Sequence, residues 1–238
     1  MPSSNPLLYT YRRCPYAMRA RMALLLAGVA FDAHEIVLRD KPADMLAVSP
    51  KGTVPVLVLC GNRVLEQSWA IVEWALNQES AGPEVRGWWS RAQSPNHQNL
   101  LLCNDGDFKH HLDRYKYPDR YAHEMEGGVF NSGIEHRDRA VALLLVPMEA
   151  SLGQGKYLGG DQPCATDIGI FPFVRQFAAV DPDWFAALPL SRIHHWLDTW
   201  RRSPLFEASM HKLPTNKRVS FPGAGDFAKA FAPGPGWS

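Results

Sequence analysis

The chain has little of what marks several protein classes. Its 238 residues contain only four cysteines, Cys14, Cys60, Cys103 and Cys164, and no two of them form a C-x-x-C pair. This excludes a dense disulfide framework and a zinc-ribbon spacing, and it favours a reducing compartment. The formal net charge is only +1. No strong field therefore points to nucleic acid or to an anionic membrane as a partner.

Long apolar runs are also missing. No stretch approaches the length that crosses a bilayer, and residues 1–6 lack the basic and apolar regions of a secretion signal. We therefore expect a cytoplasmic protein with no membrane partner. A hydrophobic fraction of 46% and a charged fraction of 21% are ordinary for a globular protein, and the length allows one or two domains.

The first third of the chain alternates between strand and helix patterns. We predict helices over 15–27 and 68–77 and a helical turn over 42–47. The predicted strands are 7–11, 34–38, 54–59 and 63–65, the last two joined by a turn at Gly61-Asn62. Strands and helices that alternate in so short a segment indicate a small α/β layer. We assign this domain to residues 1–80.

The rest of the chain has a helical pattern. Glycines and prolines break the periodicity between residues 79 and 94, which predicts a linker. Apolar residues then recur at helical spacing over 100–112, 135–152, 166–177 and 193–201, which predicts an all-α domain at 93–221. Residues 222–238 are rich in glycine, proline and alanine, and we expect a weakly ordered tail there.

Cys14 is the strongest candidate for a reactive group. It lies in Arg13-Cys14-Pro15-Tyr16-Ala17, between the first predicted strand and the first predicted helix. A thiol at this position faces the unpaired N–H groups and the positive dipole end of the helix, and Pro15 suits the first helical position. This environment favours the thiolate, so we expect a nucleophile near neutral pH. The alternative is a buried structural cysteine.

Two further motifs indicate a peptide-like ligand. Pro55, in Thr53-Val54-Pro55, stands at the start of a buried strand, where it suits an edge or a bend and where a cis bond is a candidate. Such a bend leaves the main-chain N–H and C=O of Val54 free to pair with an extended ligand. Ser68 stands where a helix begins, a position that suits a carboxylate. A strand-edge role for Pro55 and simple N-capping by Ser68 are the alternatives.

A thiol-reactive centre, a peptide-like middle and a free carboxylate together describe glutathione. Three ordered motifs, CPYA at 14–17, TVP at 53–55 and QSWAI at 67–71, make the chain resemble a glutathione S-transferase up to about Pro222. The resemblance implies a thioredoxin-like α/β N-terminal domain followed by an all-α C-terminal domain, and a homodimer. The Cys-Pro-Tyr-Ala start of the first helix is similar to the omega class and to other cysteine-type bacterial members.

The resemblance also implies residue roles. It makes Cys14 the catalytic thiol that forms a mixed disulfide with glutathione. It implies contacts with the tripeptide at Lys41, Val54, Pro55, Gln67 and Ser68: the main-chain clamp at Val54, the cis-proline at Pro55, and the γ-glutamyl holders at Gln67 and Ser68. The charge of Lys41 suits a glycyl carboxylate, and a purely solvated charge is the alternative there.

Ala17 indicates a reaction cycle that uses one cysteine rather than two. Glutaredoxins that resemble this motif carry a second cysteine at that position, so no resolving thiol lies in the helix turn. We therefore predict a monothiol cycle in which Cys14 attacks a glutathionylated substrate and a second glutathione releases the enzyme. The substrate is a small electrophile or disulfide. The alternatives are glutathione conjugation of a small electrophile, and a non-catalytic regulator that resembles the bacterial stringent starvation protein.

The helical half holds three further candidates. Phe108, His111 and Tyr115 recur at helical spacing, and we predict that they line a second-substrate pocket. We expect no metal, because the adjacent His110 and His111 point about 100° apart on a helix and do not easily share an ion. The resemblance places a capping motif at 164–167, where a cysteine replaces the usual hydroxyl residue and should weaken the capping box.

Overall fold

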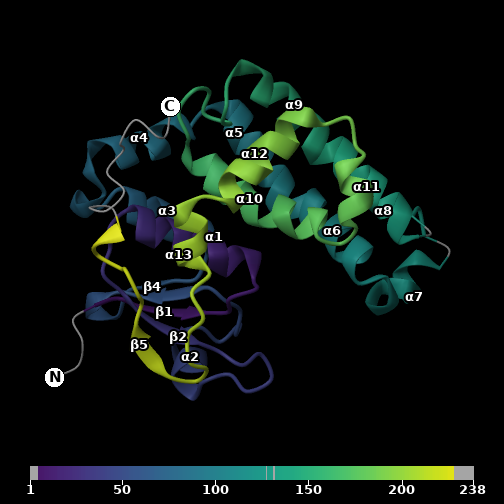
Figure 1. The fold of residues 1–238 in the computed structure, drawn as a ribbon. Helices are drawn as coiled ribbons and strands as arrows, with labels where there is room; N and C mark the ends of the chain where they lie inside the picture. Colours follow the sequence, from purple (N-terminus) through teal and green to yellow (C-terminus); the bar gives the residue numbers. More distant parts are fainter. Residues whose placement is uncertain (1–4, 127, 131, 228–238) are drawn as a thin grey trace. The chain divides into compact units, whose positions relative to one another are not determined.

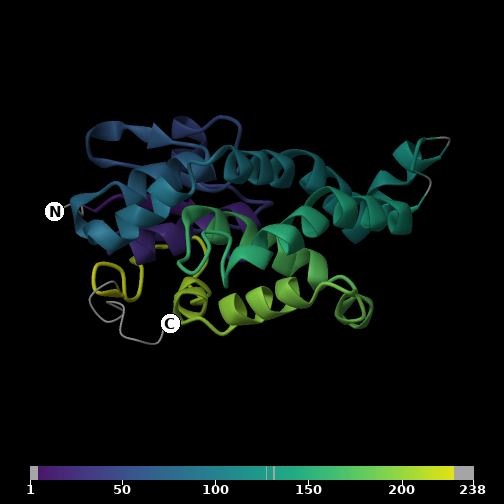
Figure 2. The same cartoon turned by 90° about the horizontal axis from the view of Figure 1, so that it is seen from above.

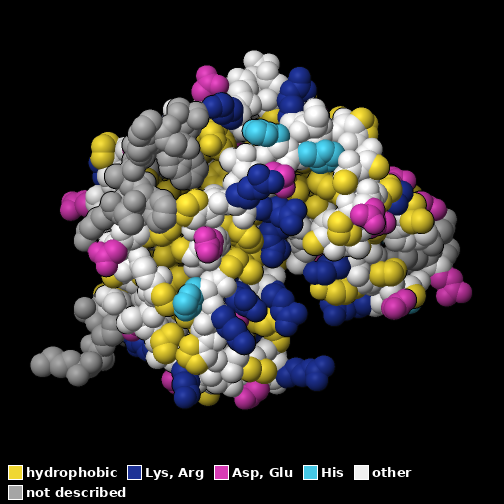
Figure 3. Space-filling model, in the orientation of Figure 1, with side chains coloured by type: hydrophobic (Ala, Val, Ile, Leu, Met, Phe, Trp, Pro, Cys, Tyr) yellow, Lys and Arg dark blue, Asp and Glu magenta, His cyan; other side chains and the backbone are white. Residues whose placement is uncertain are grey.

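The computed structural model describes residues 5–126, 128–130 and 132–227 (Figure 1). The chain forms two compact units: a sheet unit, which takes in Met1–Ser90 and Arg201–Ser238, and a helical unit, Arg91–Trp200. No helix within the described ranges is long and apolar enough to cross a membrane. Side chains of both charge signs are spread over the face drawn in Figure 3, in keeping with the small net charge.

The sheet unit is built from five strands and the helices that pack on them. In chain order its elements are β1 (Leu7–Thr10), α1 (Pro15–Leu26), β2 (Asp32–Glu35), α2 (Ala43–Val48), β3 (Val56–Val58), η1 (Cys60–Asn62), β4 (Val64–Leu65), α3 (Ser68–Leu76), η2 (Glu79–Ala81), α4 (Gly82–Arg91), α13 (Pro204–Ser209) and β5 (Arg218–Ser220). The fold class predicted from the sequence is therefore confirmed for this unit, a mixed sheet with helices.

The strand order is β4-β3-β1-β2-β5. Only β1 and β2 pair in parallel, because α1 connects them as a crossover, and the other neighbours are antiparallel. Helices α1, α3 and α13 lie on one side of the sheet and α2 on the other (Figure 1). On the α2 side, Met45 packs with Tyr9, Ile36 and Val56.

The last strand corrects the predicted domain boundaries. The sequence places residues 201–221 in the all-α domain, whereas α13 and β5 belong to the sheet unit. Strand β5 pairs with β2, and Asp32 accepts hydrogen bonds from the Arg218 guanidinium (2.8 Å) and the Ser220 hydroxyl (3.1 Å). The ring of Phe221 stacks on Phe31. A three-residue strand is too short to show periodicity. Residues 228–238 of the predicted tail lie outside the described residues.

Two other local predictions are wrong. The expected linker after residue 79 contains α4, because Gly82 and Pro83 stand at the start of that helix, where proline is tolerated. Trp88 of this helix is buried, and the Trp89 ring lies against Trp69. Strand β2 also begins and ends earlier than the predicted 34–38, since its register is set by pairing with β1.

The helical unit contains twelve helical segments within its described residues. They are α5 (Pro95–Cys103), η3 (Asn104–Phe108), α6 (Lys109–Lys116), η4 (Pro118–Tyr121), α7 (Ala122–Met125), α8 (Gly133–Ala140), η5 (Val141–Leu145), α9 (Val146–Ser151), η6 (Leu152–Gln154), α10 (Ala165–Ala178), α11 (Pro182–Ala186) and α12 (Ser191–Arg201). Segments η3 and η5 are π-helical and continue their neighbours into two long stretches, which lie side by side (Figure 2). The predicted helical character of this region is confirmed.

Asp167 joins three parts of the helical unit. It is fully buried in the first turn of α10, and its carboxylate accepts hydrogen bonds from the main-chain N–H groups of Cys164 (2.8 Å) and Leu158 (2.9 Å) and from the indole of Trp196 (2.7 Å). Both halves of the capping box are present despite the cysteine. Because a thiol is a weak acceptor, the carboxylate half carries most of the stabilisation.

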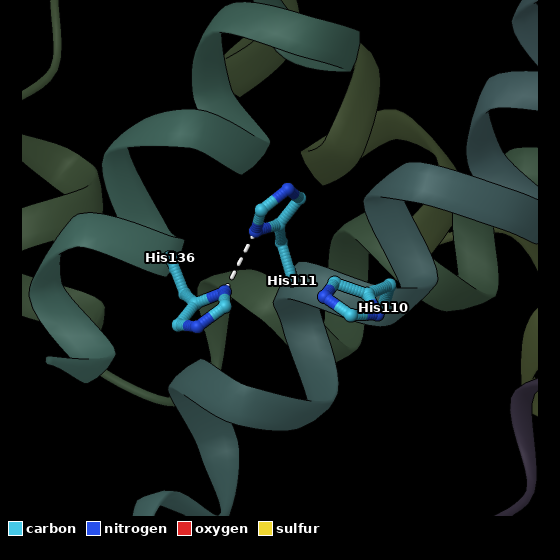
Figure 4. Close-up of side chains that lie close together, drawn as sticks. All are labelled: His110, His111 and His136. Atoms are coloured by element: carbon cyan, nitrogen blue, oxygen red, sulfur yellow. Dashed lines mark hydrogen bonds between the residues drawn. The ribbon is translucent and has the colours of Figure 1, made fainter. Parts of the chain in front are cut away.

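His111 and His136 form a second buried polar contact in the helical unit. Their Nδ1 atoms lie 2.7 Å apart, within hydrogen-bond distance, and the two rings point toward one another (Figure 4). Burial, then His136 and the cationic neighbourhood of His110 and Arg139, lowers the pKa of His111 to about 4, against a smaller opposite effect of Asp107. Burial also lowers the pKa of His136. Both imidazoles are therefore neutral at pH 7.

We expect Asp167→Ala to lower the free energy of unfolding by about 3 kcal/mol or more, because three buried donors lose their acceptor. Urea denaturation followed by circular dichroism measures the change. Asp161→Ala, at an exposed carboxylate of the same unit, is the matched control. A loss no larger than that of the control would contradict the role assigned to Asp167.

We expect acid to destabilise the helical unit through His111. A histidine whose pKa is lower in the folded chain contributes stability above about pH 6.5 that is lost as the pH falls toward the folded value, because the unfolded chain takes up the proton first. His111→Gln should therefore flatten the fall of the unfolding midpoint between pH 6.5 and about 4.5, measured in EDTA. His195→Gln, at an exposed histidine, should leave the wild-type slope unchanged.

Candidate active site

The candidate nucleophile lies where β1 leads into α1. Cys14 is the N-cap residue of α1, in extended backbone conformation, and Pro15 is the first helical residue, as predicted. The side chain is half-buried, whereas Cys164 is buried and Cys60 is exposed. Its Sγ lies 3.7 Å from the main-chain oxygen of Val54. The structure therefore brings the thiol to the second motif.

The Val54-Pro55 peptide bond is cis, which confirms that part of the prediction. Strand β3 begins directly after it, at Val56. Within the described part of the chain, the N–H of Val54 makes no hydrogen bond. This donor lies next to the thiol and is available to an extended peptide.

Lys41 also reaches this loop. The residue is exposed and precedes α2, and a Cβ placed on Gly52 would lie 3.2 Å from its Nζ. Gly52 has a φ of +61°, a left-handed conformation that favours glycine. The absent side chain at this position leaves room for the lysine amine beside the loop that leads to Val54.

The third motif starts α3. Gln67 is its N-cap residue and is exposed, and Ser68 is its first residue, only 5% exposed. The Ser68 hydroxyl accepts a hydrogen bond from the guanidinium of Arg19 at 3.2 Å. Arg19 is fully buried and lies within cation-π distance of the Tyr16 and Trp69 rings. The buried guanidinium of Arg19 therefore places a positive charge in contact with Ser68, the predicted carboxylate site.

Glu66 ties the second motif to the third. Its carboxylate accepts a hydrogen bond from the Ser49 hydroxyl at 2.6 Å, and its main-chain oxygen accepts one from Lys51 Nζ at 3.1 Å. The loop that carries Val54 is thereby held to the segment that precedes α3. Both predicted binding segments are fixed on one unit.

Arg21 holds the loop before the thiol, and sequence reasoning did not single it out. It is 1% exposed, and its guanidinium donates to the Thr10 hydroxyl and to the main-chain oxygen of Arg12, both at 2.7 Å. The Arg12 N–H donates in turn to the Glu35 carboxylate at 2.6 Å. Both main-chain polar groups of Arg12 are thus anchored two residues before Cys14. Two arginines inside the otherwise apolar run of α1 were the available signal.

The electrostatics of this cluster follow from its burial. Burial lowers the pKa of Arg21 to about 10, and Glu35 and Cys14 partly offset that fall. Burial also raises the pKa of Glu35, opposed by the Arg12 N–H and by Arg21. Arg21 is therefore a cation at pH 7, and its charge favours a negative charge on Cys14.

The three residues predicted for a second-substrate pocket lie in the helical unit. Phe108 is 0% exposed and packs on Phe177, so the structure uses it in the core of that unit. The Tyr115 ring also contacts Phe177, and lies edge-on to Trp184. His111 is buried against His136. A role of these side chains toward a second substrate stays a prediction.

Comparisons with known proteins agree on one family. Residues 8–84 match the family model described as glutathione S-transferase, N-terminal domain. The chain is 26% identical over 183 residues to the probable glutathione S-transferase MSR-1 of Nicotiana plumbaginifolia, covering 74% of this chain and 75% of that protein. It is 22% identical over 214 residues to mouse glutathione S-transferase omega-1, covering 90% of this chain and 82% of the relative.

A solved structure has the same fold. A glutathione transferase family member from Pseudomonas fluorescens, determined with two glutathione bound, superposes with a TM-score of 0.68 at 17% identity and covers 88% of this chain and 95% of that one. The N-terminal mixed sheet and the helical second part are those of glutathione transferases. The chain therefore has the glutathione transferase fold, and its residues 8–84 are similar to the N-terminal domain of that family.

Proposed function

We propose that this protein is a cysteine-type, glutathione-dependent thiol transferase or reductase that acts on a small disulfide or electrophile. One observation carries the proposal: Cys14 occupies the N-cap position of α1, and its sulfur lies 3.7 Å from the Val54 carbonyl oxygen. A helix N-terminus favours the thiolate, which is the nucleophilic form of a cysteine. The likeness to mouse glutathione S-transferase omega-1 supports the use of glutathione.

The proposed cycle has two thiol-disulfide exchanges. The Cys14 thiolate attacks the glutathione sulfur of a mixed disulfide, forms a new S–S bond and expels the substrate thiolate, which takes a proton from water. A glutathione thiolate then attacks the enzyme-glutathione bond, so that oxidised glutathione leaves and the Cys14 thiolate returns. Ala17 offers no second thiol to intercept the intermediate.

The surrounding groups bind glutathione in this proposal. The free N–H of Val54 and its carbonyl pair with the cysteinyl part of the tripeptide, after the cis bond to Pro55. Gln67 and Ser68 hold the γ-glutamyl end at the start of α3, with the buried Arg19 cation behind Ser68. Lys41 pairs with the glycyl carboxylate. A homodimer belongs to the proposal on the family resemblance.

Cys14→Ser should abolish reduction of a glutathionylated disulfide, since a hydroxyl cannot form the mixed disulfide. After treatment with oxidised glutathione, mass spectrometry should find an adduct on wild-type Cys14 that reduced glutathione removes. Cys60→Ser, at an exposed thiol, should keep both properties. Labelling confined to Cys60 or Cys103, or full activity of Cys14→Ser, would overturn the proposal. Faster conjugation of an aryl halide than disulfide reduction would instead favour a conjugating enzyme.

Arg21→Met should slow the alkylation of Cys14 by iodoacetamide at pH 7, because the loop before Cys14 loses its anchor and the sulfur loses a nearby cation. An apolar replacement of similar length keeps the buried helix packed. Arg13→Met, at the exposed arginine beside Cys14, is the matched control and should change the rate less. Equal effects of the two variants would contradict a positioning role for Arg21.

A further inference from the structure

Three histidines from two helices meet in the helical unit, whereas the residues of the proposed glutathione site belong to the sheet unit. His110 and His111 follow one another in α6, and His136 lies in α8. One ring nitrogen of each lies within 4.8 Å of one from each of the others. His111 and His136 are buried and point toward one another, and His110 is exposed beside them (Figure 4).

We propose that His110, His111 and His136 bind a divalent transition-metal cation, with Zn²⁺ as the test ion. Imidazole nitrogen is a preferred ligand of zinc, copper and nickel. Three protein nitrogens leave a fourth tetrahedral position for water or for another ligand, the pattern of an open zinc site. This inference does not depend on the proposed thiol chemistry.

The geometry needs only side-chain adjustment. Zn–N bonds of about 2.05 Å in a tetrahedron place two ligand nitrogens about 3.3 Å apart. The 2.7 Å contact between the Nδ1 atoms of His111 and His136 must therefore open by about 0.6 Å. His110 has to move closer, and it is the exposed member, so its ring is the one with room to turn.

The contribution of α8 removes the objection raised by the sequence. Two adjacent histidines diverge on a helix, and α6 alone does not aim both at one point. The His136 ring centroid, however, lies 4.9 Å from that of His111 and 5.8 Å from that of His110, so the third ligand comes from the neighbouring helix and sits near both. The rings of His110 and His111 meet edge to face at 5.0 Å.

The protonation state also suits a metal. A metal binds the neutral imidazole, and protons compete for the same lone pair. In the His111–His136 contact one Nδ1 presents its lone pair to the other ring. In the contact between two Nδ1 atoms one imidazole donates its proton. On binding, that imidazole takes the other tautomer, with its proton on Nε2.

The charges that face the three rings include both signs. The carboxylates are Asp107, Asp113, Glu124 and Glu135, and the cations are Arg114 and Arg139. Arg114 is paired with Glu124, and Asp113 with Lys109. The remaining carboxylates, Asp107 and Glu135, outnumber the remaining Arg139, which favours a bound cation.

Phe130 supplies an apolar cover. Its ring centroid lies 5.0 Å from those of both His111 and His136. An apolar group against the ligands limits access of water to the metal and restrains the orientation of the rings. The site is thus half closed, with His110 on the open side.

Zinc titration of the full-length protein tests the proposal. The titration is followed by isothermal calorimetry, in a buffer whose phosphine reductant does not bind the metal. We expect one ion per chain and higher thermal stability in its presence. His136→Asn should weaken zinc binding by at least about 100-fold. Loss of a residue that only hydrogen-bonds to a metal ligand already lowers metal affinity by about 10–100-fold, and His136 is itself a proposed ligand. His110→Ala, at the exposed ligand, should weaken zinc binding at least about tenfold without any change in folding. His195→Gln is the control.

The cysteines are the competing ligands for zinc. Cobalt in place of zinc should give visible absorption bands without a sulfur charge-transfer band, because all three ligands are nitrogens. Cys14→Ser and Cys60→Ser should bind the ions as the wild type does. Binding that is lost in either cysteine variant and kept in His136→Asn and His110→Ala would overturn the proposal, as would no measurable binding to the wild type.

Discussion

The buried guanidinium of Arg21 is the constraint on which the reactive end of the sheet unit depends. A cation inside an apolar helix is costly unless each of its donors finds an acceptor. Here the Thr10 hydroxyl and the Arg12 carbonyl accept hydrogen bonds from the two terminal nitrogens, whereas the buried Nε has no partner among the described residues. The two bonds tie the burial of α1 to the path of the loop before Cys14. Glu35 completes the arrangement from the neighbouring strand.

The same helix connects the thiol to the opposite end of the proposed glutathione site. Arg19, two residues before Arg21, reaches the Ser68 hydroxyl at the start of α3. One face of α1 thus positions the reacting sulfur and another supports the segment that the proposal assigns to the γ-glutamyl end. This makes the packing of α1 against α3 a functional as well as a structural interface.

The helical unit has its own polar supports. Asp167 satisfies two main-chain donors and an indole inside the core, while His111 and His136 share a hydrogen bond between two neutral rings. Both depend on side chains that meet from segments far apart along the chain. The first stabilises the fold; the second brings ring nitrogens of two helices together beside His110, which is why it carries a metal proposal.

The sequence by itself determined the alternation of strands and helices, the place of Cys14 at a helix N-terminus and the proline that follows Val54, because these depend on local patterns of a few residues. Only the tertiary structure decided the pairing of β5 with β2, the anchoring by Arg19 and Arg21, and the meeting of His136 with His110 and His111. Those contacts join residues 9 to 188 positions apart. No local pattern encodes which distant partner a buried polar group finds, since packing of the whole unit selects it.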